Sequence, residues 1–292
     1  MRNPYLSPLR YPGGKARVAP YLARLIRRQG ARPSIYAEPF AGGAGAALRL
    51  LADEVVRTIR LNDLSPGIAA FWRSVFLETE ELATRIERAK VDIRHWHSAR
   101  EVFHSPEGQT DVDLGFATFY LNRCNRSGIL DARPIGGLDQ GGKWKIDARF
   151  NRADLAARVR FLGQYRRRVQ VTQLDARVFV RELEPLGMDV FFYVDPPYLA
   201  QGDDLYLDSL SYDDHKELAA QLKASSLLWL LTYDVSEAVT KELYPGLRTA
   251  QFNIAHTAQR QHLGAELAVF APSLDVGSIQ LLDGANAHWV NA

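Results

Sequence analysis

The strongest constraint on the fold of this chain comes from residues 190–198. The apolar run Val190–Val194 is short and rich in β-branched and aromatic residues, and it stops at Asp195-Pro196-Pro197-Tyr198. This composition, closed by two prolines, predicts a buried strand that ends in a stiff turn. In open α/β sheets, ligands bind at the carboxyl ends of such strands. We therefore expect an α/β fold with a ligand site at Asp195.

The turn at Asp195 suits chemistry on an amino group that is attached to a heteroaromatic ring. Such an amino group is a poor nucleophile because its lone pair is delocalised into the ring. The Asp195 carboxylate and the Pro196 carbonyl can accept its two hydrogens, while Pro196 and Pro197 keep the turn rigid. Tyr198 can stack on the base, as pockets for flipped nucleotides require. The alternative is an aspartate that merely ends a strand, but the apolar strand before it and the tyrosine after it favour a catalytic motif.

A second pattern, near the N-terminus, predicts a cofactor site. A strand over Ser34–Glu38 is followed by a glycine-rich turn over Pro39–Gly45 and by a helix from about Ala46 to Ala52. This is the first unit of a nucleotide-binding α/β fold, and its glycines let the backbone approach a cofactor. Asp63 ends the next strand about 20 positions later, where ribose hydroxyls are held. Asp175 follows a later strand and is expected near the same site.

Residues 10–15, Arg-Tyr-Pro-Gly-Gly-Lys, form a tight turn before an amphipathic helix from Ala16 to Arg28. The two adjacent glycines let the backbone come close to a ligand, and Lys15 can direct a cation into the same space. The segment is not a phosphate-binding P-loop, because the spaced upstream glycine is absent and Ala16 occupies the Ser/Thr position.

The pattern changes between residues 67 and 150, where helical segments dominate and no strand of the sheet is obvious. We expect helices at 68–77, 79–90, 93–102 and 111–121, followed by a polar, glycine-rich loop. The predicted organisation is an α/β domain over 1–66 and 151–292 that is interrupted by a helical insertion over 67–150.

Positive charge gathers at the end of this insertion. The chain has a net charge of only +2, but residues 123–152 hold seven basic and three acidic side chains, a local charge of +4. Arginines, amides and aromatics on loops serve phosphate contacts, base-edge contacts and wedging into a duplex. A solvated loop is the alternative. The residues that we expect to contact nucleic acid are Tyr120, Asn122, Arg123, Asn125, Arg126, Lys143 and Lys145.

The rest of the chain continues the alternation of helices and strands and supports no other class of site. We expect helices at 153–165, 176–183, 213–223 and 236–243, strands at 168–172 and 227–232, and a final antiparallel pair at 248–254 and 266–270. Residues 199–211 are expected to form a loop or lid beside Tyr198. The single cysteine, Cys124, and histidines without metal-ligand spacing predict no metal site. There is no apolar signal core and no run of ~18 apolar residues, so we expect an intracellular (cytoplasmic) protein with no membrane span.

Taken together, the motifs resemble the Dam-type (D12 class) DNA adenine-N6 methyltransferases. The resemblance covers residues ~9 to ~271. In the family's order, the matching segments are Arg10–Lys15, Glu38–Gly45, Asn62-Asp63, Tyr120–Arg123, Trp144–Asn151 and Asp195–Tyr198.

This resemblance implies a class I, Rossmann-like methyltransferase sheet, S-adenosylmethionine as the methyl donor, and flipping of adenine from double-stranded DNA. It also implies that the helical insertion recognises the DNA target. In the catalytic motif, Asp195 would lie between cofactor and base, and Tyr198 would stack on the adenine. The residues that it assigns to the cofactor are Tyr11, Lys15, Glu38, Phe40, Gly42, Gly45, Asp63 and Asp195.

Other functions remain open at this point. The same motif serves methylation of cytosine N4, and a methyltransferase of RNA or of protein amides could reuse it. A DNA-binding protein with a retired active site is a further alternative. We expect a monomer, with a dimer as the alternative, and a setting such as restriction–modification. The recognition residues do not translate into a target sequence.

Overall fold

The computed structural model describes residues 6–10, 15–30, 32–197, 199, 210–257, 261–282 and 287–292. The chain forms two compact units, each built from two segments. The sheet unit comprises Lys15–Leu64 and Leu174–Ala292, and the helical unit comprises Met1–Gly14 and Ser65–Gln173.

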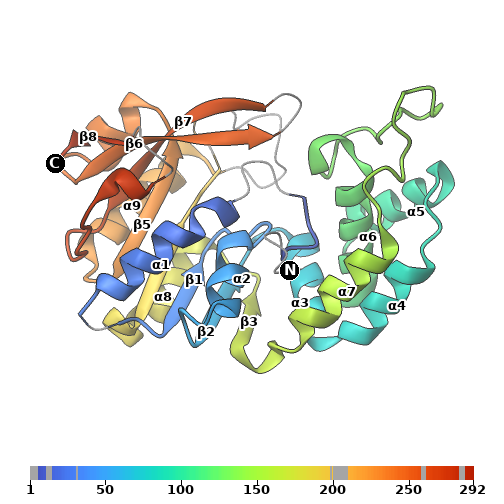
Figure 1. Ribbon diagram of the computed structural model, residues 1–292, viewed down its shortest axis with the longest axis horizontal. Coiled ribbons are helices and arrows are strands. Elements are labelled where there is room, and N and C mark those ends of the chain that lie inside the picture. Colours follow the sequence, from blue (N-terminus) through green and yellow to red (C-terminus); the bar gives the residue numbers. More distant parts are fainter. Residues whose placement is uncertain are drawn as a thin grey trace. The chain divides into compact units, whose positions relative to one another are not determined.

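The sheet unit is organised around a mixed β-sheet (Figure 1). Its strands follow the order β2-β1-β4-β5-β7-β6-β8, in which β2, β1, β4 and β5 are parallel and the last three are antiparallel to their neighbours. The bounds are β1 Ile35–Glu38, β2 Thr58–Asn62, β4 Val190–Val194, β5 Leu228–Asp234, β6 Thr249–Thr257, β7 Gln261–Phe270 and β8 His288–Asn291. The predicted α/β class is therefore confirmed.

The parallel strands bring their carboxyl ends to one edge of the sheet. β1 lies between β2 and β4, so the chain changes direction across the sheet at β1, and ligands of open α/β sheets bind at such a point. β4 is buried along its whole length, and each of its aliphatic and aromatic side chains contributes to the core. The strand therefore fixes the position of Asp195, the residue that follows it.

Helices flank this sheet in the way that the alternating sequence predicts. They are α1 Ala19–Arg28, α2 Gly45–Ala52, α8 Ala176–Leu183 and α9 Tyr212–Ala224, with short turns η1 Lys15–Arg17, η4 Glu184–Asp189 and η6 Ile279–Leu281. α1 packs on α2, and α8 packs on α9. The helix expected at 236–243 is present in part as a π-helical turn, η5, over Val239–Leu243. β8 follows the last strand pair expected from the sequence, in a region from Ser273 onward that carries little sequence signal.

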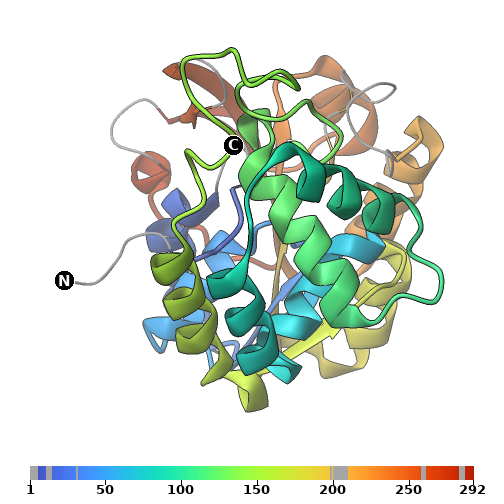
Figure 2. The ribbon, with the colours of Figure 1, turned by 90° about the vertical axis from the view of Figure 1, so that its right-hand side faces the viewer.

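The helical unit contains α3 Pro66–Leu77, α4 Thr79–Arg88, α5 Ile93–His104, α6 Asp111–Cys124 and α7 Arg152–Gly163, with η2 Arg126–Gly128, η3 Arg166–Arg168 and the short strand β3 Val169–Thr172. α6 is the central element and packs on both α3 and α5 (Figure 2). A Cβ added at Gly115 of α6 would lie 2.8 Å from the Phe71 Cα of α3, so these two helices approach closely. Asp92, Thr110 and Asn151 cap the N-termini of α5, α6 and α7 with their side chains.

The expected succession of helices over residues 67–150 is confirmed, with ends that shift by a few residues. In this stretch the structure has no strand, only an isolated bridge between Asn125 and Pro134. Among the described residues, no helix is both long and apolar enough to cross a membrane.

Candidate active site

Asp195 follows β4 directly and lies at the carboxyl edge of the sheet. Its side chain is 21% exposed, and Pro196 beside it is buried. Two donors reach the same oxygen of Asp195: the Thr232 hydroxyl lies 2.6 Å from Oδ1, and Lys15 Nζ lies 3.1 Å from it. The Asp195 carboxylate is therefore held in a fixed orientation. Tyr198, expected to stack on a base, lies outside the described residues.

Lys15 connects Asp195 to a second carboxylate. Its Nζ lies 3.0 and 2.9 Å from the two oxygens of Glu266, a side chain on β7 that is only 2% exposed. Burial by itself would lower the pKa of Lys15, but the charges of Asp195 and Glu266 and their hydrogen bonds outweigh burial and raise it. Lys15 is consequently protonated at neutral pH, as expected of a cation at this site. Its neighbours Tyr11–Gly14 lie outside the described residues.

The glycine-rich turn after β1 is held by the carboxyl group of Glu38. Glu38 Oε1 accepts hydrogen bonds from the Tyr36 hydroxyl at 2.8 Å and from the Ala47 N–H of α2 at 3.2 Å. Burial raises the pKa of Glu38 to about 8, against the lowering effect of these two donors. The nearby charge of Asp195 also raises this pKa, which indicates that the ends of β1 and β4 are electrostatically coupled.

Backbone conformation in this turn explains its small residues. Gly42 has φ 45° and Ala44 has φ 48°, both in the left-handed region that favours glycine. A Cβ at Gly45 would lie 3.1 Å from the backbone nitrogen of Ala16, so α2 begins very close to η1. Phe40, at the start of the turn, is partly exposed.

Asn62 and Asp63 join this turn to the end of β2. The Gly42 N–H donates to Asp63 Oδ2 at 2.8 Å. The Asn62 amide donates to the carbonyls of Pro39 and Leu174, and its oxygen accepts from the Leu174 N–H. Asp63 thus lies against the glycine turn, where the sequence predicts it, and Asn62 fixes the segment that leads to Asp175.

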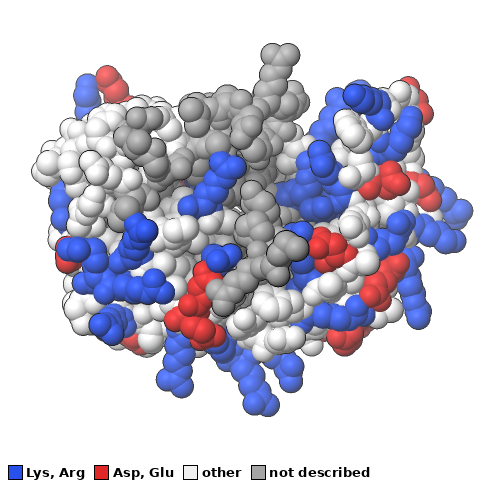
Figure 3. All heavy atoms as spheres, viewed as in Figure 1, with Lys and Arg blue, Asp and Glu red and all other residues white. Residues whose placement is uncertain are grey.

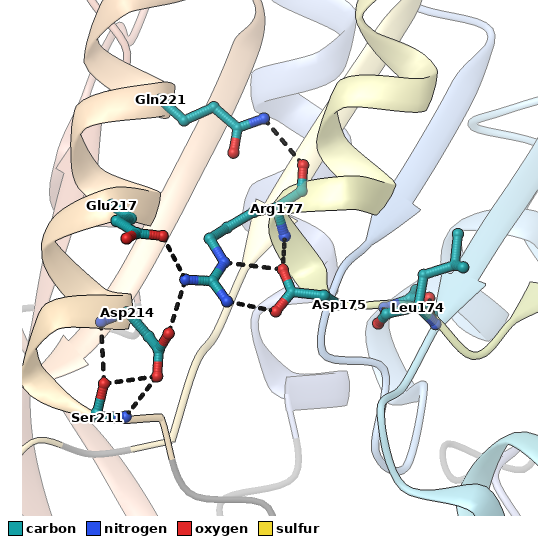
Figure 4. A network of polar contacts seen from close by, with 8 residues as sticks. Leu174, Asp175, Arg177, Ser211, Asp214, Glu217 and Gln221 are labelled. Atoms are coloured by element: carbon teal, nitrogen blue, oxygen red, sulfur yellow. Dashed lines mark hydrogen bonds and ion pairs between the residues drawn. The ribbon is translucent and has the colours of Figure 1, made fainter.

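Asp175 belongs to a network that links α8 to α9 (Figure 4). Both its oxygens accept hydrogen bonds from the guanidinium of Arg177, and it also caps α8 through the Arg177 N–H. The hydrogen bonds from Arg177 lower the pKa of Asp175. Arg177 continues to Asp214 and Glu217 of α9, at 2.6 Å each. Asp175 therefore has a structural role in this structure, and its contact with a cofactor stays a prediction.

Three of the residues expected to touch nucleic acid are inside the helical unit. Tyr120, Asn122 and Asn125 are at most 2% exposed. The Asn122 amide pairs with the backbone of Arg10 and donates to Gly128, and Asn125 accepts from the Trp96 indole. Burial this complete argues against direct contact with DNA. The two asparagines instead fix the loop that follows α6. The Tyr120 hydroxyl bonds the backbone of Lys90 and Asp92, before α5.

The charged members of the expected set are placed differently. Arg123 is partly buried and donates to the Arg149 carbonyl, and burial, together with nearby Arg10 and Arg158, lowers its pKa to about 10. Arg126, Lys143 and Lys145 are exposed. Trp144 is 64% exposed between the two lysines. Figure 3 shows that Lys and Arg side chains are frequent on the visible face of the helical unit.

Two polar residues of the site escaped sequence analysis. Thr232 is buried on β5, and Glu266 is buried on β7. The available signal was weak: Glu266 is a single charged residue inside an otherwise apolar strand segment, Ala265–Phe270. Among the described residues, no group of three or more His, Cys, Asp or Glu side chains could hold a metal ion.

The sequence matches a known protein family. The D12 class N6 adenine-specific DNA methyltransferase family model matches residues 11–262. No curated protein matches the sequence. Among solved structures, the chain is similar to the rRNA methyltransferase aviRa from Streptomyces viridochromogenes, with 13% identity over 88% of this chain and 84% of that chain and a TM-score of 0.39.

Proposed function

Because the chain belongs to the D12 class N6 adenine-specific DNA methyltransferase family, we propose that it transfers the methyl group of S-adenosylmethionine to N6 of adenine in duplex DNA. The observation that supports this proposal most directly is Asp195, whose carboxylate is oriented by Thr232 and Lys15 at the end of a buried strand. The glycine-rich turn, with Glu38 coupled to Asp195, lies at the neighbouring strand β1.

In this proposal, Asp195 and Pro196 act on the target amino group. The Asp195 carboxylate and the Pro196 carbonyl each accept a hydrogen bond from the N6 amino group. These two hydrogen bonds draw the nitrogen towards a pyramidal geometry and make its lone pair available. No covalent intermediate with the enzyme is needed. The rate enhancement comes from positioning and from fixed charges, both of which require that Asp195 does not rotate. Pro197 stiffens the turn, and Tyr198 is proposed to stack on the flipped base.

The residues of the sheet unit fit S-adenosylmethionine. The glycine-rich turn, with Gly42 in the left-handed region, lies at the strand ends where such folds bind a cofactor, and the Asp63 carboxylate suits ribose hydroxyls. Lys15, Glu38, Phe40 and Asp175 complete the proposed cofactor set in this unit, and Tyr11, which lies outside the described residues, is proposed to join it. When bound, the cofactor would supply an electrophilic methyl group on a sulfonium sulfur, and Asp195 and Pro196 would orient the N6 lone pair towards that methyl group.

We assign recognition of DNA to the helical unit. Its exposed cations Arg126, Lys143 and Lys145 suit phosphate contacts, and Trp144 between the lysines suits contact with a base or sugar. Such an enzyme acts inside the cell, where its DNA is, and we propose that it acts as a monomer. Restriction–modification is one setting that would use it.

The test is incubation with unmethylated genomic DNA and labelled S-adenosylmethionine, followed by nucleoside analysis. We expect label in N6-methyladenine, and we expect Asp195→Ala to abolish transfer while it leaves DNA binding mostly intact. Label in N4-methylcytosine, or in RNA when both polymers are offered, would replace the proposed substrate. An Asp195→Ala protein that still transfers methyl groups at the wild-type rate would refute the role of Asp195.

A further inference from the structure

The contacts of Asp195 are concentrated on one of its two oxygens. Oδ1 receives the Thr232 hydroxyl and the Lys15 ammonium group. A carboxylate oxygen offers about two lone-pair sites, so these two donors occupy Oδ1. Among the described residues, the hydrogen bond to this carboxylate reaches Oδ1, and the ion pair with Lys15 is made at the same oxygen. A substrate amino group that meets Asp195 therefore finds its acceptor at Oδ2.

The hydrogen bonds around Thr232 have a defined direction. An ionised carboxylate can only accept, so the single hydroxyl hydrogen of Thr232 is committed to Asp195. The Tyr193 hydroxyl lies 2.9 Å from Thr232 Oγ1 and must be the donor of that bond. Burial, followed by the charges of Asp195 and Glu266, raises the pKa of Tyr193, so this donor keeps its proton. The chain Tyr193–Thr232–Asp195 thus ends at Oδ1 and is buried at Tyr193 and Thr232.

Glu266 restrains the other donor. It stands opposite Asp234 in the β5–β7 register, two positions from the pair Thr232–Ala268, so Glu266 and Thr232 face the same side of the sheet. Both of its oxygens contact Lys15 Nζ, while Asp195 offers that ammonium one oxygen at the longer distance of 3.1 Å. Glu266 therefore holds Lys15 through both of its oxygens, and it limits how far the ammonium can move onto Asp195.

We propose that Thr232 and Glu266 are positioning residues of the methyl-transfer site: Thr232 and Lys15 fix Asp195 Oδ1, so that Oδ2 accepts the target amino group, and Glu266 holds Lys15 in this arrangement. The inference rests on the proposed function, because it specifies how Asp195 meets its substrate. The Asp195 carboxylate beside the amino group favours the positive charge that arises on N6 as the methyl group arrives.

The experiment compares Thr232→Val, Thr232→Ser and Glu266→Gln in the full-length protein. Methylation kinetics on unmethylated genomic DNA give kcat, and calorimetry gives the Kd of S-adenosylmethionine. Misplacement of a reacting group by about 1 Å costs up to about 100-fold in rate. We therefore expect Thr232→Val to lower kcat by about 10- to 100-fold and to leave the cofactor Kd within about threefold. Thr232→Ser, which keeps the hydroxyl, should restore kcat to within about threefold of the wild type.

A matched control separates positioning from the general loss of a buried hydroxyl. Thr249 on β6 is 1% exposed, and its hydroxyl donates to the Leu247 carbonyl. Thr249→Val should keep the wild-type kcat, and thermal melting should show that all variants are folded at the assay temperature. A Thr232→Val protein with wild-type kcat, or a Thr232→Ser protein as slow as Thr232→Val, overturns the assignment of Thr232.

Glu266 has a readout that does not depend on methylation. In protein with isotopically labelled lysine, an NMR titration follows the ammonium group of Lys15, assigned through Lys15→Arg. Glu266→Gln should lower the pKa of Lys15 and should also lower kcat by about tenfold or more. An unchanged titration overturns the assignment of Glu266. If the wild-type protein methylates no DNA, the proposed function is refuted. If Glu266→Gln nevertheless lowers the pKa of Lys15 as expected, the assignment of the Glu266–Lys15 ion pair still stands.

Discussion

Replacing Glu38 with glutamine should remove a pH dependence of stability that the wild-type protein carries. The Glu38 side chain is 4% exposed, and burial raises the pKa of its carboxyl to about 8. Glutamine has the same shape, and its amide oxygen can still accept hydrogen bonds from the Tyr36 hydroxyl and the Ala47 N–H. The substitution therefore deletes the titration and keeps the acceptor.

The sign follows from where the proton is held. In the unfolded chain the carboxyl titrates near its ordinary value of 4.5, and in the folded protein it titrates at about 8. Between these values the folded state keeps a proton that the unfolded state has released, so stability falls as pH rises. The stabilising contribution is fully present below pH 4.5 and is lost as pH rises through 8. The slope is about 1.4 kcal/mol per pH unit, or about 3 kcal/mol between about pH 5.5 and 7.5.

Urea unfolding followed by tryptophan fluorescence, at several pH values in this window, measures the effect. The free energy of unfolding of Glu38→Gln minus that of the wild type should rise by about 3 kcal/mol from about pH 5.5 to 7.5. As a control, Glu237 is exposed, and its hydrogen bond with Lys241 lowers its pKa, so Glu237→Gln should give a flat difference. A Glu38→Gln difference that is also flat would show that the buried carboxyl is ionised, which refutes the reasoning.

Three further predictions concern the helical unit. Arg126→Ala and Lys145→Ala should each weaken binding to duplex DNA and reduce the slope of log affinity against log salt concentration by about 1 in filter-binding titrations, because both side chains are exposed. Asn122→Ala, which loses buried hydrogen bonds, should lower the melting temperature and leave the salt dependence of DNA binding unchanged. A change in salt dependence for Asn122→Ala, but none for Arg126→Ala and Lys145→Ala, would contradict these roles. Gly115→Ala should lower the free energy of unfolding by about 1–3 kcal/mol, because its Cβ would collide with the Phe71 backbone. Unchanged stability in urea would show that α3 can move away from α6 without cost.

The site residues that sequence analysis could locate are those whose position is set locally. Asp195 follows an apolar strand, and Asp63 follows β2, so a short pattern was enough to place each at the carboxyl edge of a parallel sheet. Thr232 and Glu266 could not be located in this way. Thr232 reaches Asp195 through the register of β4 against β5. Glu266 reaches the site through the register of β5 against β7, two strands that are separated in the sequence by η5 and β6. A single charged residue in an apolar strand marks a buried polar role, but it does not say which partner it meets.

The buried amides of the helical unit show that residue type alone also cannot tell a buried side chain from one that contacts nucleic acid. Asn122 and Asn125 lie among arginines in the sequence, and residue type alone makes them equally suited to a base edge or to a backbone. The structure shows which partner they have. α6 is packed between α3 and α5, and both side-chain amides donate hydrogen bonds to backbone carbonyls of the loop that follows α6. The exposed cations Arg126 and Lys145 can contact phosphates in a reproducible place only if that loop is rigid. The buried amides therefore stabilise the loop rather than contact DNA, so their loss should lower the melting temperature and leave the number of phosphate contacts unchanged in the folded protein.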